Sequence, residues 1–150
     1  MRRSRLFHDE AGSAALEFIT AGFLLLIPLV YLVIAMAAIQ GGALSVEGAS
    51  RQAARVFVQA GSVAAAQSEA HTAVDFALDD FGLDSAAPMV KITCRPNPAA
   101  CLTRRGFVTV TVTASVSLPL VPSALPFSAP LSVPLSATST EQVSRFWGAG

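Results

Sequence analysis

One carboxylate, Glu17, stands directly before a long apolar stretch of this 150-residue chain. The stretch, residues 18–39, reads FITAGFLLLIPLVYLVIAMAAI and carries no charged side chain. A run of this length is sufficient to cross the hydrocarbon core of a bilayer. An ionised group beside hydrocarbon is costly and is stabilised by pairing with a cation. Glu17 is therefore a candidate for recognition by, or contact with, another chain.

Two cysteines, Cys94 and Cys101, enclose the six residues RPNPAA well after the apolar stretch. In an exported domain they would meet an oxidising compartment, where a disulfide is the default. Free thiols and redox catalysis are the alternatives, although the Cys-x-x-Cys spacing of redox motifs is absent. Two thiols with no histidine nearby do not make a four-ligand zinc site. We predict a disulfide at the end of a hairpin, which would join two adjacent strands and contribute about 2 kcal/mol.

Acidic side chains gather near the end of a predicted helix, at Asp75, Asp79, Asp80 and Asp84. Asp75 and Asp79 are four residues apart and would share one helix face. Paired carboxylates can do acid–base work or bind Ca²⁺. Because the ligand spacing of a Ca²⁺-binding loop is absent, we interpret the cluster as a solvated helix end.

The remaining sequence offers no catalytic constellation. His8 and His71 stand far from each other and from the cysteines, and no serine lies in a nucleophile-elbow pattern. A Gly-rich phosphate loop is also missing. Ten basic and ten acidic residues balance, so the charge indicates no nucleic-acid partner. We predict a protein that is not an enzyme and has no cofactor, metal or small-molecule substrate.

Composition and charge placement indicate one small domain with a membrane anchor. Hydrophobic residues make up 53% of the chain and charged residues 13%, whereas about 25% of an average soluble domain is charged. Arg2, Arg3 and Arg5 precede the apolar stretch, and the first cations after it are Arg51 and Arg55. The positive-inside rule then predicts a single-pass protein of the cytoplasmic membrane, with its N-terminus inside and its C-terminus extracytoplasmic.

The apolar stretch belongs to a predicted transmembrane helix over residues 13–40, after a cytoplasmic leader over residues 1–12. About 28 helical residues extend roughly 42 Å, which exceeds the hydrocarbon core of about 30 Å. Pro28 predicts a kink in the middle. Gly41-Gly42 predicts a flexible point just beyond the membrane.

An extracytoplasmic amphipathic helix is predicted within residues 41–82. Small or apolar residues recur there at steps of three and four, which describes one helix face. They are Ala49, Ala53, Val56, Ala60, Val63, Ala70, Val74, Ala77 and Phe81. Gly61-Ser62 is a site where this helix could break or bend, and Gly82 is a candidate C-terminal cap.

Residues 83–143 change to a period of two, which predicts a small antiparallel sheet of three strands. The three strands are expected over residues 89–94, 107–118 and 131–143. In the second, Val108, Val110, Val112, Ala114, Val116 and Leu118 share one face, and Thr and Ser residues occupy the other.

Three connecting segments complete the prediction. Residues 95–106 form the hairpin loop between the first two strands. Residues 119–130 are rich in proline and are expected to run extended over the surface. Residues 144–150 are expected to form a flexible tail, from which Phe146 and Trp147 could pack back or touch a partner.

The sequence Gly12-Ser-Ala-Ala-Leu-Glu17-Phe18 resembles the processing site of a type IV prepilin, where a peptidase cuts after Gly and the fifth mature residue is Glu. Together with the span containing Pro28 and the segment 49–55 (ASRQAAR), it resembles the TadE-like pilus assembly proteins. These are minor pseudopilins of the tight-adherence (Flp-type) systems. The cysteine hairpin and the following Val/Thr strand are similar to the actinobacterial branch, although residues 12–58 carry most of the likeness.

The resemblance implies a membrane-anchored, pilin-like α+β fold and a structural role in assembling or priming a tight-adherence type IV pilus or secretion system. Gly12 and Ser13 would be the processing site, and Glu17 and Phe18 would serve peptidase recognition and assembly. Ser13 would become the N-terminus, where other pilins have Phe or Met, and its amine would pair with Glu17 of a neighbouring subunit. The implied partners are the prepilin peptidase, the major pilin, sister pseudopilins and the inner-membrane assembly platform.

Two other interpretations stay open. The chain could be an uncleaved single-pass anchor that carries an extracytoplasmic binding module, with Glu17 incidental. It could also carry a conventional signal peptide, because Ala35-Met36-Ala37 before Ala38 resembles a small-residue cleavage site. The apolar stretch, however, is longer than the usual apolar region of a signal peptide, which has 7 to about 15 residues.

Overall fold

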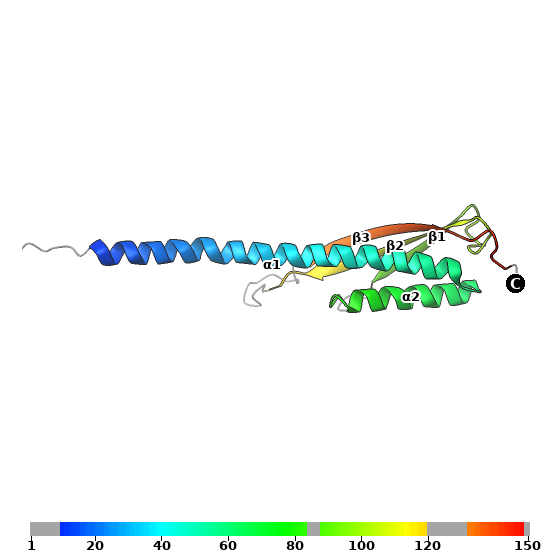
Figure 1. Cartoon of the computed structure of the whole chain (residues 1–150), viewed down its shortest axis with the longest axis horizontal. Coiled ribbons are helices and arrows are strands. Elements are labelled where there is room, and N and C mark those ends of the chain that lie inside the picture. Colours follow the sequence, from blue (N-terminus) through cyan, green and yellow to red (C-terminus); the bar gives the residue numbers. More distant parts are fainter. Residues whose placement is uncertain (1–9, 84–87, 120–131, 149–150) are drawn as a thin grey trace, which may run out of the picture. The chain divides into compact units, whose positions relative to one another are not determined.

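The structure, a computed structural model, describes residues 10–83, 88–119 and 132–148, with side chains from Ala15 onward. The chain divides into two compact units, Met1–Met36 and Ala37–Gly150. Along the chain, two helices precede three strands, which gives an α+β fold (Figure 1). The long apolar N-terminal helix, the second helix and the small antiparallel sheet are all confirmed.

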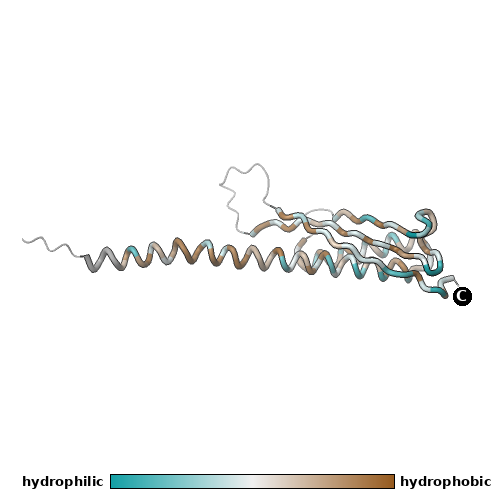
Figure 2. Tube along the Cα trace, turned by 90° about the horizontal axis from the view of Figure 1, so that it is seen from above, coloured by the Kyte–Doolittle hydropathy of each residue, from teal (hydrophilic) through white to brown (hydrophobic). Residues whose placement is uncertain are grey.

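The first unit consists of the N-terminal part of helix α1, whose full bounds are Glu10–Gln59. The helix begins three residues before the predicted start at Ser13, and it continues through Pro28 without ending. Its large apolar side chains point outward, with Leu24 75% and Leu25 72% exposed. Figure 2 shows the apolar stretch as a largely brown part of the helix. By length and composition α1 is able to cross a membrane, a property that it shares with signal sequences.

Helix α1 does not end at Gln40, and the predicted flexible point at Gly41-Gly42 is wrong. Both glycines are helical, and α1 continues to Gln59 inside the second unit. A Cβ atom on Gly42 would overlap Cγ2 of Val116 and would lie 3.1 Å from Cδ1 of Leu135. Gly42 is therefore used for close approach of the helix to the sheet, and this contact offsets the usual cost of glycine in a helix interior.

The single helix predicted after the glycine pair is in fact two helical segments. The first is the C-terminal part of α1, and the second is α2, Val63–Asp79. The helix is interrupted at residues 60–62. There the Ser62 hydroxyl caps α2 by accepting a hydrogen bond from the Ala65 N–H at 3.2 Å. The structure thus decides that the Gly61-Ser62 pair interrupts the helix.

Helix α2 ends in a Schellman motif. The N–H of Leu83 donates to the Leu78 carbonyl at 3.0 Å, and the N–H of Gly82 donates to the Asp79 carbonyl at 2.8 Å. Gly82 has a φ of 65°, a conformation that strongly favours glycine. The predicted cap at Gly82 therefore agrees with the structure.

The sheet is an antiparallel meander of β1 (Met89–Arg95), β2 (Phe107–Ser117) and β3 (Ser132–Gln142), in the order β1-β2-β3. These bounds match the predicted strands to within a residue. Thr111 of the central strand lies opposite Lys91 on one side and Thr138 on the other. The predicted proline-rich loop lies outside the described residues, apart from its first residue, Pro119.

One face of the sheet and the two helices of the second unit enclose a single apolar core (Figure 1). In β2, Val108, Val110 and Val112 are fully buried, as their alternation predicts. The helices contribute fully or almost fully buried residues to the same core: Val46, Ala49, Ala53, Ala54, Phe57, Ala66, Ala70, Val74 and Leu78. Predicted core positions Val63 and Phe81 are instead exposed, because the bend at residues 60–62 shifts the buried stripe of α2.

The opposite face of the sheet is lined with hydroxyl groups. Thr109 and Thr140 share a hydrogen bond of 2.8 Å, and Thr111 and Thr138 share one of 3.0 Å. Such cross-strand pairs stabilise an antiparallel sheet whose outer face is solvated.

The chain does not remain free after β3. The indole Nε1–H of Trp147 donates to the Ala60 carbonyl at 2.9 Å, and Arg104 Nε donates to the Trp147 carbonyl at 2.9 Å. Trp147 therefore closes over the bend between α1 and α2, whereas Phe146 stays 66% exposed. The expectation of a flexible tail does not hold for residues 144–148, and the alternative that Trp147 packs back is confirmed.

Candidate functional site

Glu17 lies in the first unit, on a stretch of α1 whose other side chains are mostly apolar. Its neighbours Leu16 and Phe18 are 68% and 80% exposed, and Glu17 is exposed as well. Among the side chains that the structure describes, Glu17 has no hydrogen-bond or ion-pair partner. The next charged residue along the chain is Glu47, thirty residues later. Among the described side chains from Ala15 to Val46, Glu17 is the single carboxylate, and the helix surface around it is mostly apolar.

Gly12 and Ser13 belong to the first turn of α1. The first four N–H groups of a helix have no partner within the helix, and this turn contains them. Ser13 precedes Glu17 by four residues, which places both on the same helix face. The side chain of Ser13 is not among those that the structure describes, so the processing site stays a prediction.

A shallow apolar groove follows Glu17 on the same helix. It is lined by Ile19, Thr20, Phe23, Leu24, Ile27 and Pro28. The Thr20 hydroxyl donates to the Leu16 carbonyl at 2.7 Å, so its polar group is satisfied within the helix. The groove therefore presents hydrocarbon to its surroundings, which suits contact with lipid or with the side chains of another helix.

Cys94 and Cys101 form a disulfide, with their Cα atoms 5.1 Å apart. Cys94 is the penultimate residue of β1, and Cys101 lies within the loop that leads to β2. The peptide bond between Arg95 and Pro96 is cis. The predicted pairing is confirmed, but Cys101 is not part of β2, so the bond fastens the loop to the end of β1 and does not join two strands.

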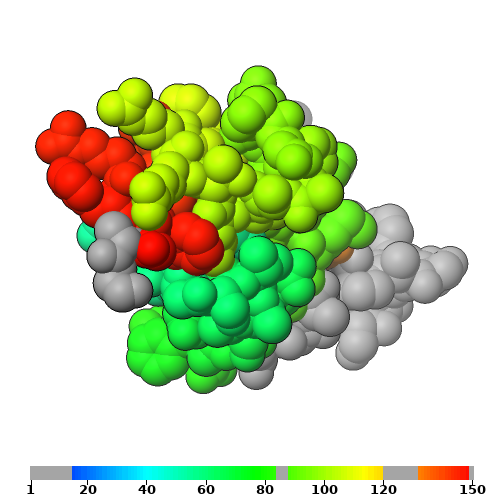
Figure 3. Space-filling view, turned by 90° about the vertical axis from the view of Figure 1, so that its right-hand side faces the viewer, coloured from blue at the N-terminus to red at the C-terminus, as the bar shows by residue number. Residues whose placement is uncertain are grey.

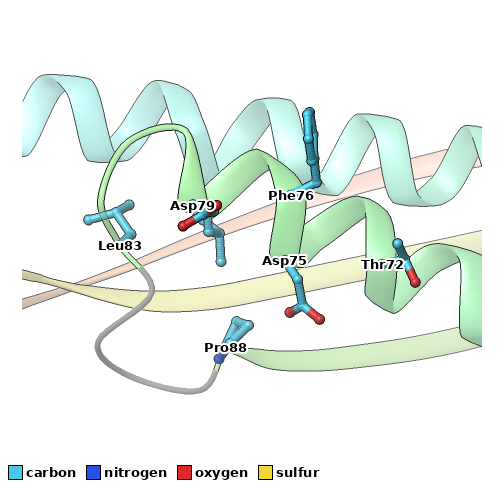
Figure 4. A pocket seen from close by; sticks show the side chains of 7 residues that line it. Thr72, Asp75, Phe76, Asp79, Leu83 and Pro88 are labelled. Carbon is cyan, nitrogen blue, oxygen red and sulfur yellow. The ribbon is translucent and has the colours of Figure 1, made fainter.

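Asp75 and Asp79 line a hollow beside the C-terminal end of α2 (Figure 4). Both carboxylates are exposed, and Asp80 next to them is exposed too. Within the described ranges no group of three or more Asp, Glu, His or Cys residues is arranged to hold a metal ion. Asp84, the fourth acidic residue of the predicted cluster, lies outside the described residues.

Sequence reasoning missed a basic tip at the end of the sheet that carries the disulfide. Figure 3 shows the loop before β2, the segment after β3 and the bend between the helices gathered on one face. Arg95, Arg104, Arg105 and Arg145 are exposed there. A signal for this tip exists in the sequence, because no Asp or Glu occurs between residues 85 and 140.

The loop and the segment after β3 hold each other in place at this tip. The Val143 N–H donates to the Gly106 carbonyl at 2.8 Å, and the Arg105 N–H donates to the Val143 carbonyl at 3.1 Å. Arg105 has a φ of 61°, which is uncommon for a residue other than glycine.

Comparison of the chain with profiles of known protein families, with curated protein sequences and with solved structures finds no significant match.

Proposed function

We propose that this chain is a structural subunit of the TadE-like kind, a minor pseudopilin that helps to assemble or prime a tight-adherence type IV pilus. In this proposal α1 anchors the chain in the cytoplasmic membrane as a single span, with the second unit on the extracytoplasmic side. A prepilin peptidase cuts after Gly12, and the role of the mature chain is not enzymatic.

The observation that carries the proposal is the lone carboxylate on an exposed apolar helix. Toward the C-terminus, the next charged residue after Glu17 is Glu47, and toward the N-terminus it is Glu10, seven residues away. An isolated charge at the edge of hydrocarbon is disfavoured unless a cation approaches it. The free amine created at Ser13 of a neighbouring, axially displaced subunit would supply that cation. Pairing of this kind would make helix-to-helix assembly depend on correct processing.

A second observation that supports the proposal is that α1 has an exposed apolar part and a part that packs in the core of the second unit. Its first part presents side chains such as Leu25 and Phe18 outward, whereas its later residues Val46 and Phe57 are buried in the core of the second unit. One continuous helix thus belongs both to the apolar anchor and to the folded domain. This arrangement of α1 suits a subunit that is stored in a membrane and then packed beside other helices. The proposed partners are the peptidase, the major pilin, sister pseudopilins and the inner-membrane platform.

The mature N-terminus tests the processing step. We expect mass spectrometry of the protein purified from its own host to find a chain that starts at Ser13. A Gly12→Leu variant serves as the control, because it should retain the complete leader. A natural chain that starts at Met1 or Arg2 would instead support the uncleaved binding module, and a start at Ala38 would support a signal peptide.

A second experiment tests the role of Glu17. Glu17→Ala should insert into the membrane as well as the natural chain but should impair pilus assembly. Glu17→Asp keeps the charge and should retain more assembly than Glu17→Ala. Equal piliation in the natural strain and the Glu17→Ala strain would exclude the proposed pairing with the Ser13 amine.

A further inference from the structure

The hollow beside the end of α2 combines an apolar lining with an acidic rim. It has a volume of about 560 Å³ and is lined by Thr72, Asp75, Phe76, Leu78, Asp79, Leu83 and Pro88. In Figure 4 the Asp75 side chain extends toward Pro88, and Asp79 lies between Phe76 and Leu83. Such a hollow suits a ligand that has an apolar body and a positive group beside it.

Large apolar side chains are exposed around this hollow. Phe76 and Met89 are each 71% exposed, and Phe81 is 55% exposed. They lie at the end of α2, just after it and at the start of β1. Clusters of exposed apolar residues with a polar rim are typical of surfaces that bind another protein.

The basic tip of the same unit presents a group with the matching chemistry. The guanidinium carbon of Arg145 lies 4.5 Å from the centroid of the Phe146 ring, in a cation–π contact. Phe146 is 66% exposed, although its neighbours are held in place: its N–H donates to the Ser144 hydroxyl at 3.1 Å, and Trp147 is anchored to Ala60. An exposed ring on a fixed backbone loses little freedom when it binds.

Charge is also unevenly distributed between the α2 segment and the segment that follows it. From Val63 to Leu83 the chain carries Glu69, Asp75, Asp79 and Asp80 and no Lys or Arg. From residue 85 to residue 140 it carries Lys91, Arg95, Arg104 and Arg105 and no Asp or Glu. Complementary potentials of this kind select partners and fix their orientation.

The two surfaces cannot meet within one copy. The tip adjoins the bend before α2, through the hydrogen bond from Trp147 to Ala60, whereas the hollow lies at the other end of α2. The 17 residues of α2 from Val63 to Asp79 span roughly 24 Å at about 1.5 Å per residue. The matching surfaces therefore lie at opposite ends of α2, which suits contact between different copies.

We propose that the hollow receives the tip of a second copy of this chain, with Phe146 against the apolar lining and Arg145 beside Asp75 and Asp79. Because the two surfaces differ, the contact is head-to-tail and repeats in an open series. The proposal needs neither cleavage at Gly12 nor pairing of Glu17, so its outcome is independent of those steps.

Photo-crosslinking of the full chain in detergent micelles, where a membrane does not hold the copies at one level, tests this contact. A photo-reactive benzoylphenylalanine replaces Phe146 in one copy, and a second copy carries heavy nitrogen, so that mass spectrometry separates contacts between copies from contacts within one. We expect crosslinks from position 146 of one copy to residues 72–83 or to Pro88 of the other. The same probe at Thr138, on the outer face of the sheet, is the control and should give no such product.

Charge reversal provides the matching variants. Arg145→Glu should lower the yield of this crosslink about tenfold, as expected for an interface anchor. The pair Asp75→Arg and Asp79→Arg should lower it similarly, and combining all three changes should restore most of it. Lys91→Glu, which reverses an exposed charge opposite Thr111 on the outer face of the sheet, should leave the yield unchanged. Crosslinks only to detergent or to another protein, or no recovery in the combined variant, would overturn the proposal.

Discussion

The two units of this protein use the same helix in opposite ways. In the first unit the apolar residues of α1 cover its whole circumference and point outward, and Leu25 is 72% exposed. In the second unit α1 buries one stripe, which includes Phe57 at 0% exposure, and leaves charged residues such as Arg51 outside. A helix that is apolar all round needs an apolar environment, whereas a striped helix needs only a partner on one side.

The difference teaches where the stability of each part originates. In the first part of α1, hydrogen bonds within the helix satisfy the backbone N–H and C=O groups, so this part tolerates an apolar solvent. The later part depends on packing, because small residues such as Ala49 and Ala53 let the sheet come close and Gly42 removes the Cβ that would collide with Val116. Substitutions should therefore have effects that depend on the unit more than on residue type.

Truncation of Phe57 should have the largest effect. Phe57→Ala leaves a cavity in the core of the second unit, and we expect it to lower the free energy of unfolding by about 3–5 kcal/mol. Urea unfolding of the full chain in detergent micelles measures this loss through the fluorescence of Trp147, the single tryptophan. Leu25→Ala in the first unit is the control and should leave this transition in place. Equal shifts in the two variants would abolish the contrast between the units.

A charge in the middle of the apolar stretch tests the first unit. Leu26→Arg should reduce membrane insertion by about 2.5–3.5 kcal/mol, because a guanidinium is costly at the centre of a bilayer. The fraction of the chain that resists alkaline extraction from membranes measures insertion, and Leu26→Ala is the matched control. If both variants were retained equally, the proposal that this stretch spans the membrane would fail.

Removal of the disulfide should have an intermediate effect in the second unit. Replacing Cys94 and Cys101 with Ser should cost about 2 kcal/mol, because the bridge closes only a short loop. Urea unfolding again gives the loss. A reductant should shift the natural chain by the same amount and leave the double variant unchanged, so a further shift in the variant would indicate another cause.

The smallest effect is expected at the end of the described chain. Trp147→Phe keeps an aromatic ring but removes the indole N–H that donates to the Ala60 carbonyl. We expect this change to lower the free energy of unfolding by about 0.5–1.5 kcal/mol. Pulse proteolysis across a urea series measures this change without the lost fluorophore. Phe146→Leu, at an exposed position, should stay within about 0.5 kcal/mol. The reverse order would show that residues 144–148 do not close over the helix bend.

Local patterns were sufficient to predict several elements. The alternation of Val and Thr in β2 correctly predicts its buried and exposed faces, and the cysteine spacing predicts the disulfide. Interruptions were harder to predict, because Gly41-Gly42 and Gly61-Ser62 look alike as helix breakers. The first pair remains helical against the sheet, whereas the second ends the helix, and burial decides between them.

The residues of the candidate site also fall into two groups, those that the sequence suggests and those that only the structure brings together. Glu17, Gly12 and Ser13 are candidates that the sequence alone suggests, because the resemblance that marks them depends on spacing beside an apolar run. The hollow and the basic tip are not, because each gathers residues that are distant in the chain. Asp75 and Pro88 meet only after α2 turns back to β1, and Arg104 meets Trp147 only after the sheet is complete.

By itself, the sequence determined the apolar helix, the strand periods, the cysteine pair and the uneven distribution of charge, since these depend on composition and on short repeats. The tertiary structure alone decided that α1 continues to Gln59, that Trp147 packs back on Ala60, and which surfaces stay exposed. The physical reason is that helix ends and exposed patches depend on which distant residues are close enough to exclude water, and local propensity contains no information about such contacts.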